Sequence, residues 1–186
     1  MCRHAPLLCN GTGWVIVLAI IISMLALFAT LYEAYLQRTH NRKSVRPLIQ
    51  IDLGDHENKL YVYIRNNGLG PMIIDKLSFT KNGTPYAYIK DCLDIPSTSY
   101  MHVLVNDAAK RVVLPNAHLV VFEKAFGDHA QNTEIDLVRK QLTPITLKVN
   151  YRDIYDNKFT FVRDLNWFSR HVLSNEMSKS DKIHSH

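Results

Sequence analysis

Aromatic and cationic side chains alternate in one short stretch of the sequence, KLYVYIRN, which covers residues 59–66. Two tyrosines and an arginine fall at every second position, so a β-strand would place all three on one face. Residues 145–152 place a lysine and an arginine on one strand face in the same way. Aromatic rings beside cations can stack bases and pair with the phosphates of a small nucleotide. The predicted ligand-binding residues are Tyr61, Tyr63, Arg65, Lys148 and Arg152.

An alternative interpretation of the tyrosine row is structural: the two rings would cover a second sheet or contact another subunit. The glycine-rich stretch NNGLGP also has a structural interpretation. Gly68 and Gly70 lead into Pro71 and a strand, whereas phosphate-binding glycine loops lead into a helix. We therefore expect a turn that uses the positive φ of glycine.

The sequence gives no pattern that is typical of a catalytic or metal site. No Ser–His–Asp order and no supported pair of carboxylates is present, and no histidine lies at metal-ligand spacing from a cysteine. We predict that the protein is not an enzyme, has no catalytic residues, and binds neither a metal nor a cofactor.

The elements that would position these side chains are short strands. Alternation of apolar and polar residues predicts strands over residues 47–53, 59–66, 72–80, 84–89, 100–105, 111–114, 118–124, 145–152 and 158–165. One helix is predicted over Asn132–Leu142, with Asn132 as its cap. Pro85 favours a sheet edge, and Asp156 and Asn157 favour a hairpin turn. Many strands without alternating helices indicate an all-β, immunoglobulin-like antiparallel sandwich with one short helix.

A different element precedes the strands. No charged residue occurs from Ala5 to Tyr32, and the stretch from Trp14 to Leu31 is long enough to cross a bilayer. A basic run follows it directly and no small-x-small cleavage site is present, so we predict a retained N-terminal transmembrane α-helix and not a signal peptide. Small residues form one stripe of this helix and predict an oligomer face, although such residues are common in any membrane helix. They are Ala19, Ser23, Ala26 and Thr30.

Charge is distributed unevenly along the chain. The net charge is +5, but the residues before Pro47 carry five basic side chains and one acidic side chain, and residues 47–165 carry fourteen of each. A neutral body gives no support for binding long nucleic acid, which needs a large basic surface. The basic residues after the helix predict that the N-terminus lies outside and the body in the cytoplasm, at a cell inner membrane. Cys92, the single cysteine of the body, fits a reducing compartment.

Five segments result from these patterns. Residues 1–13 form a short extracytoplasmic tail, 14–36 the transmembrane helix and 37–46 a basic juxtamembrane segment. Residues 47–168 form the soluble β-sandwich, and 169–186 a C-terminal tail that is mostly disordered.

The stretches VRPLIQI, IRNNGLGPMII and VNYRDIYDNKF, within Val45–Phe159, carry a resemblance to the immunoglobulin-like sandwich domains of single-pass bacterial membrane proteins. The sequence departs from that pattern at Met72 and Asp156, where alanine and glycine are expected. The overall plan is also similar to the small membrane effectors of type III CRISPR defence, although no motif carries this second likeness. It implies an oligomer that binds cyclic tetra-adenylate in the cytosol and acts on the membrane.

Three functions therefore remain open, of which a membrane-linked enzyme has the least support. The first is an oligomeric single-pass effector whose cytosolic domain binds a cyclic oligonucleotide, a cyclic oligoadenylate, and acts on the membrane in antiviral defence. The second is a membrane-anchored protein-interaction module. The expected partners are the lipid bilayer, further copies of the chain in a homo-oligomer and a cyclic oligonucleotide, but not long nucleic acid.

Overall fold

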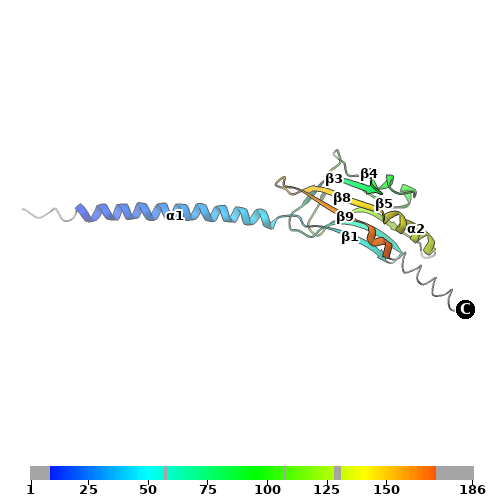
Figure 1. The fold of residues 1–186 in the computed structure, drawn as a ribbon. Helices are drawn as coiled ribbons and strands as arrows, with labels where there is room; N and C mark the ends of the chain where they lie inside the picture. The colour runs from blue at the N-terminus through cyan, green and yellow to red at the C-terminus, as the bar shows by residue number, and fades with distance from the viewer. Residues whose placement is uncertain (1–8, 57, 107, 128–130, 171–186) are drawn as a thin grey trace, which may run out of the picture. The chain divides into compact units, whose positions relative to one another are not determined.

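The chain divides after Ser44 into a helical unit and a β-rich unit (Figure 1). A computed structural model describes residues 9–56, 58–106, 108–127 and 131–170. Most of the two predicted tails lies outside these residues. Helix α1 (Cys9–Ser44) begins within residues 1–13, the segment predicted as the N-terminal tail. Gly11 and Gly13 each cost about 1 kcal/mol of helix propensity, but neither blocks the backbone hydrogen bonds as proline would.

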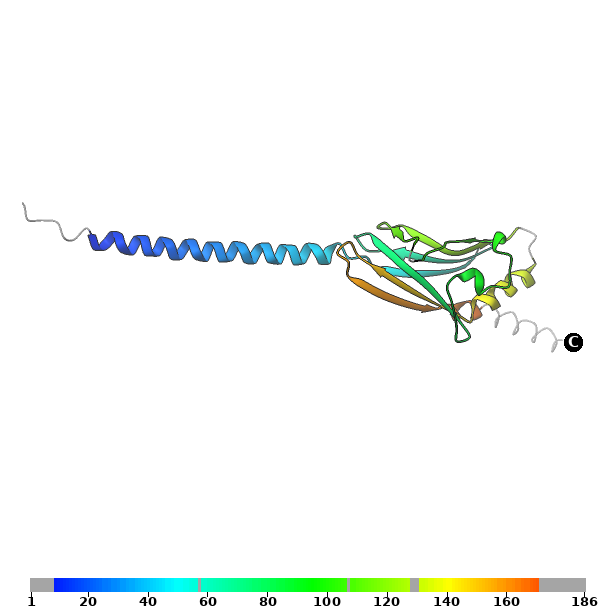
Figure 2. The ribbon, with the colours of Figure 1, turned by 90° about the horizontal axis from the view of Figure 1, so that it is seen from above.

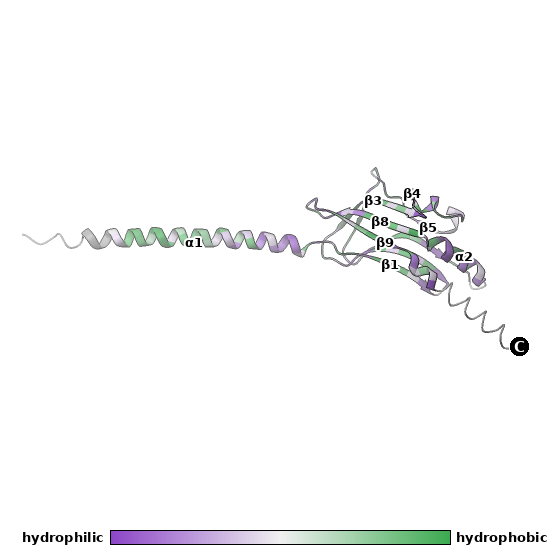
Figure 3. Cartoon of the chain, in the orientation of Figure 1, coloured by the Kyte–Doolittle hydropathy of each residue, from purple (hydrophilic) through white to green (hydrophobic). Residues whose placement is uncertain are grey.

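Helix α1 has the length and composition of a membrane-spanning helix. Its large apolar side chains from Trp14 to Leu36 are all between 47% and 71% exposed, so none is covered by protein. Figure 3 shows apolar residues along most of the helix and polar residues near Ser44. Residues 37–44 of the predicted basic juxtamembrane segment continue the same helix.

The β-rich unit consists of two antiparallel sheets (Figures 1 and 2). The first sheet contains, in spatial order, β1 (Ile49–His56), β2 (Lys59–Asn66), β7 (His118–Ala125) and β5 (Met101–His102). The second contains β4 (Thr84–Tyr86), β3 (Met72–Lys81), β8 (Ile145–Arg152) and β9 (Lys158–Asp164), and β6 (Arg111–Val113) also pairs with β3. The predicted fold class, an apolar N-terminal helix followed by an antiparallel sandwich, is confirmed.

Alternation along the strands builds the core between the sheets. In β2, the fully buried residues are Leu60, Val62 and Ile64, and β8 contributes Leu147 and Val149 from the opposite sheet. The C-terminal part of the described chain closes this core, since the side chains of Leu165 and Phe168 are also fully buried. Burying such side chains stabilises the fold by about 1.5–3 kcal/mol each.

Helix α2 has the predicted bounds, Asn132–Leu142, and buries Ile135, Val138 and Leu142. Its cap differs from the prediction. Gln131 is the N-cap residue, no side chain caps the helix, and Asn132 is already helical.

Two predicted strands are shorter than expected. The segment after β4 turns into a 3₁₀ helix, η1 (Ile89–Asp91), and β5 is followed by irregular chain; η2 (Ser97–Ser99) and η3 (Asn166–Phe168) are further 3₁₀ turns. Ile89 and Cys92 are buried in the core, so packing has replaced strand pairing there. Pro85 lies in an edge strand, as predicted.

One partly buried ion pair joins α2 to β1. The guanidinium of Arg139 donates to both carboxylate oxygens of Asp55, from Nε at 2.8 Å and from Nη2 at 2.7 Å. Its Nη1 donates to Asp136 at 2.7 Å. The Arg139 and Asp55 side chains are only 14% and 6% exposed. These hydrogen bonds, foremost the one to Asp55, raise the pKa of Arg139.

A buried amide holds the segment that leads into β1. The Asn66 side chain is fully buried; its Oδ1 accepts from the backbone of Leu48 at 3.2 Å and of Gly68 at 3.0 Å. Its Nδ2 donates to the carbonyl oxygens of Gly70 at 2.8 Å and Val113 at 3.1 Å. Asn66 therefore fastens residues 45–48 and two loops together. We call residues 45–48, with Asn66, Gly68 and Gly70, the linker clamp.

The glycines of NNGLGP serve this clamp, and not a turn with positive φ as predicted. Neither Gly68 nor Gly70 has a positive φ. A Cβ atom on Gly68 would lie 2.3 Å from the carbonyl oxygen of Arg46, and one on Gly70 would lie 1.7 Å from that of Val45. Both positions need glycine because another backbone segment approaches closely.

Candidate functional site

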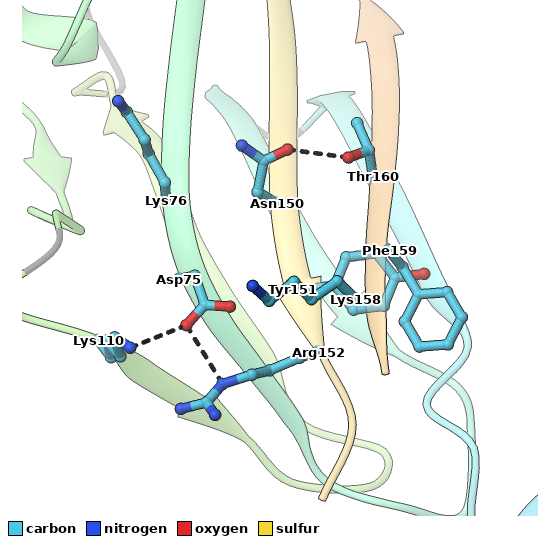
Figure 4. Close-up of a pocket in the computed structure, with 9 residues that line it drawn as sticks. All are labelled: Asp75, Lys76, Lys110, Asn150, Tyr151, Arg152, Lys158, Phe159 and Thr160. Carbon is cyan, nitrogen blue, oxygen red and sulfur yellow. Dashed lines mark hydrogen bonds and ion pairs between the residues drawn. The ribbon is translucent and has the colours of Figure 1, made fainter. Parts of the chain in front are cut away.

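The outer face of the second sheet carries a basic hollow of about 600 Å³ (Figure 4). Three strands build it. On β3, a register shift between Ile74 and Lys76 leaves Asp75 as an extra residue, so Asp75 and Lys76 both project outward. The hairpin of β8 and β9 places Arg152 opposite Lys158. The lining residues are Asp75, Lys76, Lys110, Asn150, Tyr151, Arg152, Lys158, Phe159 and Thr160.

The lining of this basic hollow contains four cationic side chains and a single carboxylate. Asp75 Oδ1 lies 3.2 Å from Lys110 Nζ and 3.3 Å from Arg152 Nε, and Arg152 also contacts Asp156. Among the residues that the structure describes, Lys76 and Lys158 have no carboxylate within ion-pair distance. The basic hollow therefore has positive charge left to receive an anion.

Neutral groups complete the lining. Asn150 accepts a hydrogen bond from Thr160 at 3.0 Å across β8 and β9, which leaves its amide NH₂ available as a donor. The rings of Tyr151 and Phe159 stack with centroids 5.3 Å apart. Both rings pack on the core, so the cations and the amide are the groups that can meet a ligand, and they suit a phosphate or a carboxylate.

The hairpin at one end of the basic hollow is held by a buried carboxylate. Asp153 is 1% exposed and accepts hydrogen bonds from the backbone of Tyr155 at 2.8 Å and Asn157 at 3.0 Å. Burial alone would raise the pKa of Asp153, but the hydrogen bonds from Asn157 and Tyr155 outweigh it, so the pKa lies below its usual range. Asp156 has a φ of 63°, which agrees with the predicted turn and explains why glycine suits this position.

The predicted ligand-binding residues fall into two separate groups. Lys148 and Arg152 lie on β8 and face outward from the second sheet; Arg152 lines the basic hollow and Lys148 lies beyond it. Tyr61, Tyr63 and Arg65 lie on β2 and face outward from the first sheet. The core separates the two groups, so one subunit does not bring them together. Their binding role stays a prediction.

The tyrosine row is packed against its neighbours. Tyr63 is only 8% exposed, and its ring stacks on Tyr61 at 4.3 Å and on His118 at 4.5 Å. Its hydroxyl donates to Glu123, which also pairs with Lys59 at 2.8 Å. Both faces of the Tyr63 ring are thus occupied, and base stacking on this ring would require displacing a neighbour.

Charges on this first-sheet face are paired as well. Arg65 Nε lies 2.6 Å from Asp52. Burial raises the pKa of Tyr63, and its hydrogen bond to Glu123 adds to this. For Glu123, hydrogen bonds from Lys59 and Tyr63 outweigh the opposing effect of burial and lower the pKa. The side chains of this outer face therefore bind one another. They do not cover the second sheet, and contact with another subunit stays a prediction.

The helix stripe also has its polar groups satisfied. Ser23 donates to the carbonyl oxygen of Ala19 at 2.7 Å, and Thr30 donates to that of Ala26 at 2.8 Å. The two hydroxyls therefore donate within α1 itself. A neighbouring helix would meet the stripe through its small side chains and not through free hydroxyl donors. Its role as an oligomer face stays a prediction.

A family model described as "Domain of unknown function (DUF8453)" matches residues 10–170. The chain belongs to this family. The matched range includes nearly all of α1 and every strand of the sandwich, so the apolar helix and the β-domain together form the DUF8453 unit.

Two solved structures have a remote likeness to this DUF8453 chain. The archaeal flagellum of Methanospirillum hungatei strain JF1 is 8% identical with a TM-score of 0.27, and the match covers 83% of this chain and 92% of that one. The archaellum periplasmic stator protein FlaG from Sulfolobus acidocaldarius is 9% identical with a TM-score of 0.24, and the match covers 62% of this chain and 100% of that one.

Sequence reasoning missed most of the basic hollow of this DUF8453 domain. It identified Arg152 but not Asp75, Lys76, Lys110 or Lys158. Lys158 could have been predicted from the sequence, because a hairpin turn at Asp156 and Asn157 places it opposite Arg152. Lys110 comes from a distant loop and gives no such signal. Within the described residues, no group of three or more His, Cys, Asp or Glu side chains is arranged to hold a metal.

Proposed function

We propose that the protein is a membrane-anchored binding module that recognises an anionic ligand at the basic hollow. The observation that carries this proposal is the excess of cations there, with Lys76 and Lys158 lacking ion-pair partners among the described residues. We assign the protein no catalytic role.

The more specific form of this proposal names a cyclic oligonucleotide, a cyclic oligoadenylate, as the ligand. The phosphates would pair with Lys76, Arg152 and Lys158, and Lys148 would extend the same face. In a symmetric homo-oligomer, each subunit would present the same cations to a symmetric ligand, and the stripe of α1 would carry the signal into the membrane in antiviral defence. The tyrosine row is not part of this site.

A protein partner is the second candidate, favoured by the edges of the sheets. Among the described strands, β1 pairs only with β2, and β9 pairs only with β8, so each has one free edge. An extended segment of a partner could add to such an edge, and acidic side chains beside it would meet the basic hollow from β9. The protein would then be a membrane-anchored protein-interaction module.

Removal of the two unpaired lysines tests the proposal. We expect the Lys76→Gln and Lys158→Gln double variant, as the full chain in phosphatidylcholine nanodiscs, to bind fluorescent cyclic tetra-adenylate at least about tenfold more weakly, since each charge-assisted bond is lost. Binding should also weaken with added salt. The measurement is fluorescence anisotropy.

The matched control removes two exposed lysines elsewhere, Lys90→Gln and Lys140→Gln, and should leave binding unchanged. Inorganic polyphosphate and an acidic peptide serve as competing anions. If the wild-type chain binds polyphosphate but shows no preference for the cyclic nucleotide, the proposed ligand is wrong, while the proposal of an anion-binding site at the basic hollow is supported. If none of these anions shows saturable binding to the wild-type chain, the proposal that the basic hollow binds an anion is wrong.

We further propose that the β-domain lies in the cytoplasm at a cell inner membrane, with the N-terminus outside, because Arg38, Arg42, Lys43 and Arg46 follow the apolar part of α1. A green fluorescent protein fused after His186 should fluoresce, and alkaline phosphatase fused there should be inactive. An active phosphatase fusion together with a non-fluorescent green fluorescent protein fusion would show the opposite orientation. Intracellular messengers would then be excluded as ligands.

A further inference from the structure

Exposed apolar side chains gather on the loops at one end of the sandwich. They come from the segment before β1, the β2–β3 loop, the β6–β7 turn and the β8–β9 hairpin. We call them the apolar rim: Leu48, Leu69, Leu114, Ile154 and Tyr155. Their exposed fractions are 62%, 74%, 61%, 49% and 42%, so a large part of each side chain is in contact with solvent.

Strand register puts these loops at the same end. Ile49 pairs with Asn66, Met72 with Val113, and Ile73 with Arg152, so the loops that precede or follow these residues are neighbours. Separate apolar residues on a surface are ordinary, but a group on adjacent loops marks an interaction surface.

Hydrogen bonds hold the rim loops in place. The linker clamp joins Leu48 to the β2–β3 loop, where the backbone of Asn67 also donates to the Leu48 carbonyl at 2.8 Å. The Asn116 backbone donates to the carbonyl of Asn66 at 2.8 Å, which brings in the β6–β7 turn. Asp153 orders the hairpin that carries Ile154 and Tyr155. The rim is therefore preformed and needs little ordering on binding.

Chain connectivity limits how far the rim can move from a membrane that α1 crosses. Residues 37–44 continue the helix and β1 begins at Ile49, so the chain between Leu36 and the rim spans at most about 30 Å. A tethered surface of this kind samples the bilayer at a high effective concentration.

The surroundings of the rim suit a lipid surface better than a second copy of the chain. Arg46 lies in the linker clamp with its guanidinium 5.0 Å from the Phe159 ring, and Lys158 begins β9 beside the hairpin. Aliphatic tips, a tyrosine and flanking cations are the composition of surfaces that bury in the headgroup region of a bilayer.

We propose that the apolar rim docks onto the lipid bilayer, inserting Leu69, Leu114 and Ile154 into the interfacial region. This docking fixes which end of the sandwich faces the membrane. It does not depend on any ligand in the basic hollow, and it holds for either side of the membrane.

Site-specific fluorescence in the full chain tests the docking. Cys2 and Cys9 are first replaced by serine, and Cys92 can stay because it is 2% exposed and burial raises its pKa to about 11. The variants Leu69→Cys and Ile154→Cys are labelled with an environment-sensitive dye and reconstituted in vesicles of phosphatidylcholine and phosphatidylglycerol. The control label is placed at Thr84→Cys, an exposed residue that follows the end of β3 remote from Met72.

We expect both rim labels to emit at shorter wavelength than the Thr84 label and to be quenched by spin-labelled lipids, whereas the control label is not. Replacing Leu69 and Leu114 with serine should reduce quenching of the label at Ile154→Cys. Rim labels that match the control in wavelength and quenching would overturn the proposal. Rim labels shielded from water but not quenched by lipid, with cross-linking between copies, would overturn it in favour of a second copy of the chain.

Discussion

The Gly70→Ala substitution is expected to destabilise the β-domain by at least about 3 kcal/mol, the upper end of the range for overpacking. The added methyl group would lie 1.7 Å from the carbonyl oxygen of Val45. Because the obstacle is backbone and not a flexible side chain, relief requires moving residues 45–48 away from Asn66. Urea unfolding of the full chain in detergent, followed by far-UV circular dichroism, measures the change.

Gly127→Ala provides the matched control. A Cβ atom at Gly127 has no neighbour within 4 Å and its φ is not positive, so this variant should stay within about 0.5 kcal/mol of wild type. If Gly70→Ala were as stable as Gly127→Ala, the linker clamp would not have the close packing described above.

Replacing Arg139 with alanine is expected to cost about 3 kcal/mol, because it leaves the Asp55 carboxylate, 6% exposed, without its bidentate partner. The loss should exceed that of an ordinary surface ion pair, which is about 0–1 kcal/mol. The same urea unfolding experiment measures it.

Lys140→Ala, at an exposed cation on the next position of α2, should change stability by less than about 0.5 kcal/mol. Removing both partners, with Asp55→Asn and Arg139→Met, should restore part of the loss, because the more deeply buried of the two carboxylates that Arg139 contacts is then neutral. A double variant as unstable as the sum of the single ones would show that the two side chains do not interact.

Local patterns were sufficient to predict the elements of this fold. Alternation in residues 59–66 and 145–152 placed two core strands correctly, and terminal signals gave α2 its observed bounds, although Asn132 is not the cap. Patterns failed where packing decided the conformation. Ile89 and Cys92 reach the core from a 3₁₀ turn and the residue that follows it, and residues 37–44 continue the helix because nothing interrupts its backbone hydrogen bonds.

The candidate site was harder to predict because it depends on which strands lie side by side. Period-two spacing puts Tyr61 and Lys148 on strand faces correctly, but it does not reveal that these faces point in opposite directions. The extra residue on β3 that turns Asp75 outward also has no signal in local alternation. The glycines of NNGLGP were identified as necessary, but the reason, close backbone approach, comes from a segment about twenty residues earlier in the chain.

The burial of Leu165 and Phe168 also determines when folding can be completed during protein synthesis. These side chains close the core, and β9 is an edge strand of its sheet, so the interior of the domain is incomplete until the segment up to Phe168 has left the ribosome. Helix α1 is synthesised before the strands and can enter the membrane while they are still unfolded. The anchor is thus in place before the domain that it carries exists.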